Sequence, residues 1–229
     1  MLFAAGFGSR MGKLTATKPK PLIPVGGRAL IDHALALADA AQIGRIVVNL
    51  HYLGDQLVDH LRGRAIQFAW EREVILETGG GLRAALPLLG AGPVMTVNTD
   101  AVWTDQSALR QLLDHWNDET MDCLLLLLPH DRVAGHEGRG DFMMDQSGKI
   151  SRANGRDGLI YLGAQIIRTN GLAKIAEVQF SLNVVWDEMI AADRAFGLVY
   201  NGQWCDVGSP EGISLAEAML TAAAEYRDV

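Results

Sequence analysis

Short apolar runs alternate with longer amphipathic stretches along the first half of the chain. The short runs are bounded by turn residues, as buried strands are, and they predict strands at Leu2–Ala5, Ile46–Leu50, Ile66–Trp70, Val94–Asn98 and Cys123–Leu128. The stretches between them repeat apolar residues at spacings of three and four, which predicts helices at Leu30–Ala41, Gly54–Leu61, Gly80–Leu89 and Ser107–Trp116. This alternation predicts an α/β fold with three layers, in which helices cover both faces of a mostly parallel sheet.

The second half has a different pattern. Three closely spaced strand-like runs, separated by the turn sequences QSG and NGRDG, cover Asp141–Met144, Lys149–Arg152 and Leu159–Ile167. They predict a small antiparallel insertion or an edge layer added to the sheet. Two further helices are predicted at Leu182–Ala192 and Pro210–Arg227. A length of 229 residues without a linker or a repeat fits a single domain, 1–229.

The charge balance of the chain is acidic, because 20 Lys and Arg residues against 27 Asp and Glu residues give a formal net charge of −7. This balance argues against a nucleic-acid-binding surface, which needs a concentrated basic face, but not against phosphate ligands, which a few local cations can hold. The two cysteines, Cys123 and Cys205, have no metal-ligand spacing and indicate a reduced compartment. No signal peptide is indicated, and the longest apolar run, Cys123–Pro129, is far shorter than the ~20 residues that cross a bilayer. We therefore expect a cytoplasmic protein without a membrane or nucleic-acid partner.

A glycine-rich turn, AAGFGSRM at Ala4–Met11, follows the first predicted strand. Ligands of open α/β sheets bind beyond the carboxyl ends of the strands, and small residues there let backbone amides approach a phosphate. Gly6 and Gly8 match the first two glycines of the dinucleotide fingerprint, but Met11 stands at the third position and no Walker lysine is present. The turn is therefore a phosphate loop of another type or a plain tight turn.

Four cations fall within eleven positions of this acidic chain, residues 10–20: Arg10, Lys13, Lys18 and Lys20. Pro19 and Pro21 flank Lys20 and hold it in an extended segment that cannot be the interior of a helix. A merely solvated basic loop has no need of these prolines, so the segment favours phosphate binding.

The loop and the segment after it resemble the opening signature of the nucleotidyltransferases that join a nucleoside triphosphate to a sugar 1-phosphate. The matching residues are Ala4, Ala5, Gly6, Gly8, Arg10, Met11 and Pro19–Leu22. Four more segments resemble motifs of this family in the same order: Leu76–Leu82, Asn98–Asp100, Tyr161–Ile166 and Trp204–Glu211. The resemblance covers nearly the whole chain. It implies the Rossmann-like nucleotide-diphospho-sugar transferase fold, with a nucleotide-binding half at 1–130 and a sugar-binding half at 131–229.

The resemblance also implies a reaction in which a phosphate oxygen of the sugar attacks the α-phosphorus of the nucleotide and pyrophosphate leaves. It implies Mg²⁺ held by Asp100 and Asp206, Arg10 steadying the leaving pyrophosphate, and Lys20 holding phosphate oxygens. Such a reaction needs positioned cations rather than a nucleophilic side chain. Taken alone, each aspartate could equally be a turn or helix cap, and Asp105 is interpreted as the N-cap of the helix after it.

The remaining residues of the expected site follow from the same resemblance. Nucleotide contacts are expected from Ala4, Ala5, Gly6, Gly8, Ser9, Glu77, Gly80 and Gly81. Sugar contacts are expected from Asn98, Gly140, Asn154 and Gln165. Trp186 stands in an amphipathic context, which is typical of a core or rim residue rather than a ligand-binding one.

Within this family, several segments most resemble the N-acetylmuramate 1-phosphate uridylyltransferases of peptidoglycan recycling, which implies UTP and N-acetylmuramate 1-phosphate as substrates. Two departures keep alternatives open. Met11–Lys13 (MGK) replaces the usual Arg-Pro pair and is similar to the enzymes that attach a nucleotide to the molybdenum cofactor, and Thr99 stands where the family has Gly. The alternatives are a guanylyl- or thymidylyltransferase acting on another hexose 1-phosphate, the molybdenum-cofactor type, and a non-catalytic nucleotide-sensing module. The protein is expected to be a monomer or a small homo-oligomer.

Overall fold

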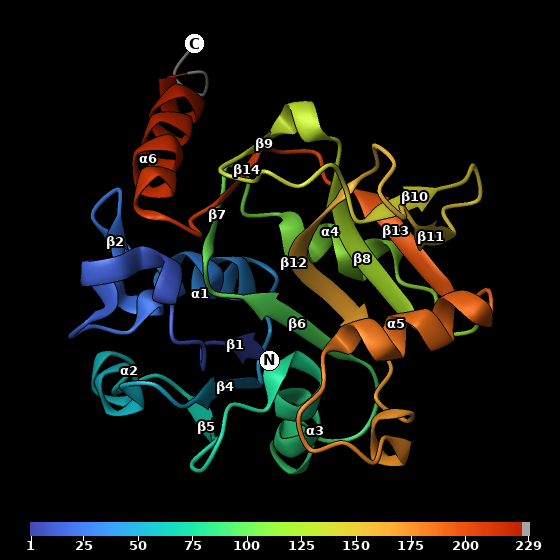
Figure 1. Cartoon of the computed structure of the whole chain (residues 1–229), viewed down its shortest axis with the longest axis horizontal. Helices are drawn as coiled ribbons and strands as arrows, with labels where there is room; N and C mark the ends of the chain where they lie inside the picture. The colour runs from blue at the N-terminus through green and yellow to red at the C-terminus, as the bar shows by residue number, and fades with distance from the viewer. Residues whose placement is uncertain (226–229) are drawn as a thin grey trace.

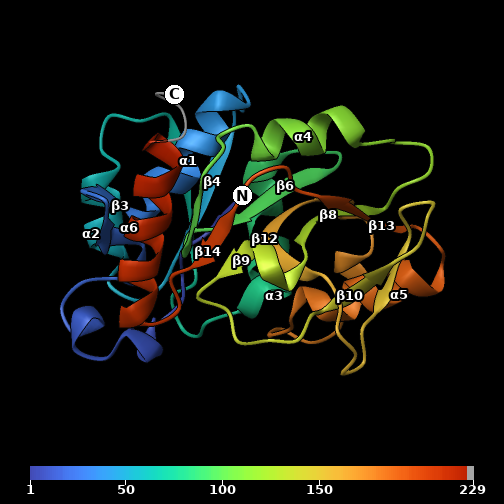
Figure 2. The same cartoon turned by 90° about the horizontal axis from the view of Figure 1, so that it is seen from above.

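The computed structural model of the chain describes residues 1–225 and forms three layers, with a central sheet between two layers of helices (Figures 1 and 2). The sheet has seven strands in the spatial order β13 (Ala195–Val199), β8 (Cys123–Leu128), β12 (Ile160–Ile167), β6 (Val94–Asn98), β1 (Leu2–Phe3), β4 (Ile46–Leu50) and β5 (Ile66–Trp70). Every pair of neighbours is parallel except those that include β12, which runs antiparallel to both β6 and β8. The predicted three-layer α/β fold with a mostly parallel, mixed sheet is confirmed.

Helices cover both faces of this sheet. Their bounds are α1 (Leu30–Ala40), α2 (Gly54–His60), α3 (Glu77–Leu89), α4 (Ala108–His115), α5 (Leu182–Ala191) and α6 (Pro210–Glu225). Apolar residues of α1, α2 and α4 share one core cluster with one face of the sheet, and those of α3 and α5 share a second cluster with the other face (Figure 2). Within β8, Leu124, Leu126 and Leu128 lie in the first cluster, whereas Cys123, Leu125 and Leu127 lie in the second. This strand is apolar throughout because both of its faces are buried.

The prediction of an edge layer in the second half is wrong for its third strand. β12 lies inside the main sheet, between β6 and β8, and seven of its eight residues are buried. The turn sequences before this strand locate its start, but they carry no information about which strands it pairs with. The insertion itself is the two-stranded sheet of β10 (Phe142–Met144) and β11 (Ile150–Arg152).

A three-stranded sheet joins the two halves of the chain, with β14 (Trp204–Asp206) in the middle, between β7 (Ala101–Trp103) and β9 (Val133–Ala134). The C-terminal helix α6 follows β14, and the part of its predicted range that includes Arg227 lies outside the described residues. A short hairpin of β2 (Pro24–Val25) and β3 (Arg28–Ala29) and four 3₁₀ helices complete the fold: η1 (Ser9–Thr15), η2 (Lys20–Leu22), η3 (His130–Arg132) and η4 (Leu172–Lys174).

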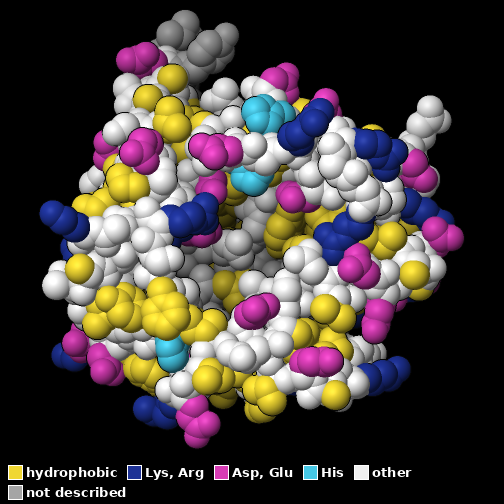
Figure 3. Space-filling view, in the orientation of Figure 1, with side chains coloured by type: hydrophobic (Ala, Val, Ile, Leu, Met, Phe, Trp, Pro, Cys, Tyr) yellow, Lys and Arg dark blue, Asp and Glu magenta, His cyan; other side chains and the backbone are white. Residues whose placement is uncertain are grey.

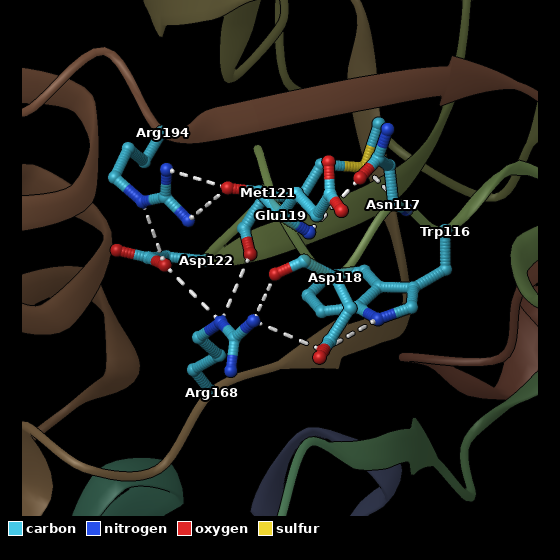
Figure 4. A network of polar contacts seen from close by, with 8 residues as sticks. All are labelled: Trp116, Asn117, Asp118, Glu119, Met121, Asp122, Arg168 and Arg194. Carbon is cyan, nitrogen blue, oxygen red and sulfur yellow. Dashed lines mark hydrogen bonds and ion pairs between the residues drawn. The ribbon is translucent and has the colours of Figure 1, made fainter.

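A polar cluster fastens the starts of β8 and β13 to the end of β12. The Asp122 carboxylate lies between two guanidinium groups, with Arg194 Nε at 2.8 Å and Arg168 Nε at 3.3 Å (Figure 4). Arg168 also donates to the backbone oxygens of Asp118 and Met121. These groups are only partly exposed, so their ion pairs are stronger than pairs in open water. The cluster lies at one end of the sheet, and the carboxyl ends of β1 and β6 lie at the opposite end.

Within residues 1–225, no helix combines the length and the apolar character needed to cross a bilayer.

Candidate active site

A cavity of about 220 Å³ opens at the carboxyl ends of β1 and β6. It is lined by the loop after β1, by the segment around Lys20, by two polar side chains near the ends of β4 and β5, by the start of α3 and by the end of β6. These residues are Phe3–Gly6, Lys20, Pro21, Asn49, Glu71, Ile75, Glu77, Thr78 and Asn98–Asp100. Figure 3 shows that the middle of this face is hollowed and that basic, acidic and histidine side chains lie around the rim. The expected nucleotide contacts Ala4, Ala5, Gly6 and Glu77 are among the lining residues.

Gly8 shapes the loop after β1 but does not line the cavity. Gly8 has a φ of 63°, and a Cβ there would lie 2.8 Å from Cβ of Lys20 and 3.0 Å from Cγ2 of Thr15. The missing side chain therefore lets the Lys20 segment pack directly against the loop. Met11 anchors the loop in a small core with Cys205 and Val207. Ser9, another expected nucleotide contact, begins η1 and is not among the residues that line the cavity.

We predict that Gly8→Ala lowers turnover more than Gly12→Ala does. Both glycines have positive φ, so both variants lose roughly 1–2 kcal/mol of stability from backbone strain. Only at Gly8 does the new methyl group displace Lys20, because a Cβ at Gly12 meets nothing within 4 Å. Melting temperatures and kcat/KM of both variants check this, and equal losses of turnover would show that backbone strain alone is responsible.

Strand pairing brings the two predicted metal-binding carboxylates together. β14 runs antiparallel to β7 with Asp206 opposite Ala101, the residue after Asp100. The amide of Val207 donates to the backbone oxygen of Asp100 at 2.9 Å. Residues from opposite halves of the chain therefore meet at one end of the cavity.

Two predicted cations lie beside these carboxylates. Lys20 is buried, and its Nζ lies 2.8 Å from Oδ2 of Asp100. Arg10 passes over the turn after Asp206, where a Cβ on Gly208 would lie 2.8 Å from Arg10 Nη1. The structure thus gathers all four residues for which a catalytic or metal-binding role is predicted.

The pKa of Asp206 is raised above its ordinary value of 3.8, chiefly because the carboxyl is partly buried and also because the Asp100 carboxylate is close. Lys20, Arg10 and His136 oppose this rise. The ionised form of Asp206 is therefore destabilised in this cluster, and a cation bound beside it would stabilise that form.

A buried polar network on the other side of the cavity is not predicted from the sequence. Asn49 Oδ1 accepts from the amide of Ala4 at 2.7 Å, and Asn49 Nδ2 donates to Oε1 of Glu71 at 2.7 Å. Glu71 Oε2 in turn accepts from the amide of Leu76 at 2.7 Å. The network fixes the loop after β1 against the start of α3. Its sequence signal was a single polar residue inside the apolar run IVVNL and a carboxylate directly after the next strand.

The glycines of α3 serve packing rather than the cavity surface. A Cβ on Gly81 would lie 2.7 Å from Oε1 of Glu71, and one on Gly80 would lie 2.5 Å from the backbone oxygen of Val178. The amide of Gly80 donates to the backbone oxygen of Phe180. The structure therefore places Gly80 and Gly81 inside the helix, behind the cavity wall, and their predicted nucleotide contacts stay a prediction.

A second cavity, of about 270 Å³, adjoins the first and shares Phe3, Thr78 and Asn98 with it. Its other lining residues come from β10, β11, β12 and the start of α5: Asp141, Phe142, Arg152, Tyr161, Ser181, Leu182, Asn183 and Trp186. Asn98, an expected sugar contact, thus stands between the two cavities.

The other three expected sugar contacts lie elsewhere around the second cavity. Gly140 has a φ of 133° and is close to Gly158, so it shapes the loop before Asp141. Asn154 is exposed in a turn and does not line the cavity. Gln165 is fully buried and accepts from Trp186 Nε1 at 2.8 Å, which holds the indole that forms one wall.

The chain is similar to known nucleotidyltransferases over most of its length. The family model for the MobA-like NTP transferase domain matches residues 1–136. The chain is 36% identical to the N-acetylmuramate alpha-1-phosphate uridylyltransferase of Caulobacter vibrioides, over 97% of each protein. It is 33% identical to the protein of the same name from Neisseria meningitidis, over 97% of this chain and 98% of that one.

A solved structure, HddC from Yersinia pseudotuberculosis complexed with GMP-PN, superposes with a TM-score of 0.75 at 20% identity, over 95% of this chain and 96% of that one. This likeness shows the shared fold. The match over the whole chain, together with the cation and carboxylate cluster at the carboxyl ends of the strands, shows that the chain belongs to the nucleotidyltransferase family that includes the N-acetylmuramate alpha-1-phosphate uridylyltransferases.

Proposed function

We propose that the protein transfers a uridylyl group from UTP to N-acetylmuramate 1-phosphate, releases pyrophosphate, and works in cell-wall sugar recycling in the cytoplasm. One observation carries the proposal: two adjoining cavities share Asn98, and the first of them has Lys20 and Asp100 in its wall. Such an arrangement accommodates a nucleotide and a sugar with their phosphates meeting at the cations. The names of the Caulobacter and Neisseria relatives support this choice of substrates.

The reaction breaks one bond and forms one. An oxygen of the sugar 1-phosphate attacks the α-phosphorus in line, and the bond from this phosphorus to the bridging oxygen of pyrophosphate breaks. Lys20 and Arg10 offset the repulsion between the two anionic substrates and stabilise the charge on the transferring phosphoryl group. The side chains bind and orient the substrates, and the attacking group belongs to the substrate itself.

We also propose that Asp100 and Asp206 hold Mg²⁺. Two carboxylates with hard oxygen donors fit this ion, which keeps several of its waters and needs few protein ligands. The raised pKa of Asp206 beside Asp100 supports a cation between them. Bound there, Mg²⁺ would supply positive charge to the phosphate oxygens.

The molybdenum-cofactor type of transferase is the second candidate, and the Met11–Lys13 segment favours it. In the structure Met11 is buried, while Gly12 and Lys13 are exposed, so only Lys13 of this segment presents a charge to solvent. The adjoining second cavity has an aromatic wall of Phe142, Tyr161 and Trp186, and this wall supports a sugar 1-phosphate as the second substrate.

The test is pyrophosphate release from purified protein with Mg²⁺, each of the common nucleoside triphosphates, and a panel of sugar 1-phosphates. We expect the highest kcat/KM for UTP with N-acetylmuramate 1-phosphate, and no release from an Arg10→Ala variant. Turnover of GTP with mannose 1-phosphate and none of UTP would overturn the proposed specificity. Nucleotide binding without any turnover would indicate a sensing module.

A further inference from the structure

Arg152 is a cationic side chain in the wall of the second cavity, and its surroundings hold it rigidly. Its guanidinium carbon lies 4.9 Å from the ring centre of Phe142 and 5.7 Å from that of Trp186. Its Nε donates to Asp187 Oδ1 at 2.7 Å, and its Nη2 donates to the backbone oxygen of Asn183 at 3.0 Å. The Arg152 side chain is only 25% exposed.

These contacts leave part of the guanidinium free. Within residues 1–225, Nη1 of Arg152 donates no hydrogen bond, so both of its N–H groups remain for a ligand. A planar guanidinium with a fixed orientation and unused N–H groups is well suited to a carboxylate, which it can bind through two parallel hydrogen bonds. The two rings and the two hydrogen bonds already order this side chain in the folded protein, so a ligand would bind it with little further loss of conformational entropy.

Asp141 lies in the same wall and limits where a ligand's negative charge can go. Its Oδ2 accepts from the amide of Tyr161 at 2.8 Å, and none of the ion pairs within residues 1–225 joins it to Arg152. A ligand that suits both groups presents a hydroxyl or amide donor to Asp141 and an anionic acceptor to Arg152. A sugar 1-phosphate with a carboxylate on its ring has both, whereas a neutral sugar leaves Arg152 without its partner.

We propose that Arg152 is the residue that selects acidic sugar 1-phosphates, by binding the carboxylate that the sugar carries as a ring substituent. This inference rests on the proposed function and adds a specificity-determining residue to it. Trp186 and Gln165 are positioning residues, because the hydrogen bond from the indole to the buried amide fixes one of the two rings on which Arg152 lies.

The experiment compares N-acetylmuramate 1-phosphate with N-acetylglucosamine 1-phosphate, which lacks only the lactyl ether and its carboxylate. The selectivity is the ratio of the two kcat/KM values, acidic over neutral. In Arg152→Met, which keeps the apolar stem, the selectivity should fall roughly 10- to 100-fold, the range for loss of hydrogen bonds to a charged group. In Arg152→Lys, which keeps the charge but not the planar fork, it should fall by an intermediate factor.

Two control variants separate carboxylate binding from packing. Arg156 is the next arginine along the same segment, and it donates to the backbone oxygen of Ala153 outside the cavity, so Arg156→Met should keep the selectivity of the wild type. Asp187→Asn removes the ion-pair partner of Arg152 but no cavity-lining group, and it should lower the selectivity much less than Arg152→Met. Where the neutral sugar is turned over too slowly to measure, the melting-temperature shifts caused by UDP-N-acetylmuramate and UDP-N-acetylglucosamine compare the two binding affinities instead, and Arg152→Met should lose the same preference for the acidic ligand.

Unchanged selectivity in Arg152→Met would overturn the inference. If both kcat/KM values fell equally, the result would show that Arg152 has a packing role. Wild-type protein that turns over neither sugar would instead contradict the proposed function itself, so the two failures are distinguishable.

Discussion

Replacement of Asp206 by Asn should abolish nucleotidyl transfer and, in the absence of Mg²⁺, raise the melting temperature of the protein. Turnover should fall about 10³-fold or more, because the substitution removes an expected ligand of the ion that neutralises the transferring phosphates. The melting temperature should rise by roughly 1–3 °C, since the neutral amide escapes both the burial of a charge and the repulsion from Asp100. A change that stabilises the fold while removing its activity is typical of functional sites.

The gain in stability should depend on pH with a defined sign. The folded-state pKa of Asp206 is raised, so its carboxylate costs the most stability at pH values above that raised pKa and none at pH values well below the ordinary value of 3.8. As the pH falls through the raised value toward the ordinary value of 3.8, the wild-type residue becomes protonated and the advantage of Asn should disappear. Thermal melts of both proteins across this range, without metal, measure the difference.

Asp105→Asn is the matched control. Asp105 accepts from the amide and hydroxyl of Ser107 at 2.9 and 2.6 Å. The prediction that Asp105 is the N-cap of α4 is wrong, because Ser107 is the N-cap residue and Asp105 holds the turn before it. We expect this variant to keep its turnover within about threefold and to melt slightly lower than the wild type. A lower melting temperature for Asp206→Asn without metal would contradict the electrostatic account of the cluster.

Lys20→Met should have the opposite effect on stability and a similar effect on activity. Lys20 is the buried cation beside Asp100, and without it both carboxylates face each other with only Arg10 and His136 nearby. We expect a loss of about 1–3 kcal/mol, which is less than the 3–5 kcal/mol of a fully buried broken pair because the Asp100 side chain is 34% exposed. Turnover should fall about 10³-fold because Lys20 also holds phosphate oxygens in the proposed reaction.

The double variant Lys20→Met with Asp206→Asn distinguishes charge from packing. If the loss in Lys20→Met comes from uncompensated negative charge, removing one carboxylate should restore most of the stability and none of the turnover. A double variant that melts no higher than Lys20→Met would show that the apolar stem of Lys20, and not its charge, is what stabilises the site. Lys13→Met, an exposed cation of the same loop, should melt like the wild type.

The local pattern of apolar and polar residues was sufficient to predict those elements whose bounds depend on their own residues. The bounds of β4, β5, β6 and β8 match the predicted strands, because each is a short, largely apolar run bounded by turn residues. The glycine-rich loop and the Lys20 segment could also be located, because Gly8 and the flanking prolines impose backbone conformations that few other residues allow.

Tertiary pairing was the part that local pattern could not supply. Nothing near β12 in the sequence indicates that it separates β6 from β8, since register and neighbours depend on distant strands. The wall of the second cavity escaped prediction for a related reason. Trp186 is mostly buried and belongs to the core, as predicted. It also lines the second cavity because it lies beside Arg152 and Phe142, which the sequence pattern does not indicate.

The pairing of β14 with β7 has a consequence for how the enzyme folds. The two strands close a loop of about 100 residues, and closing so long a loop from an unfolded chain costs roughly 4 kcal/mol in entropy. Three residue pairs of backbone contact offset little of that cost, so the strands should meet only after the intervening residues have folded and brought their ends near each other. Recovery of catalysis on refolding should therefore lag behind recovery of secondary structure, and turnover would report that the whole chain, rather than its first half, has reached the native state.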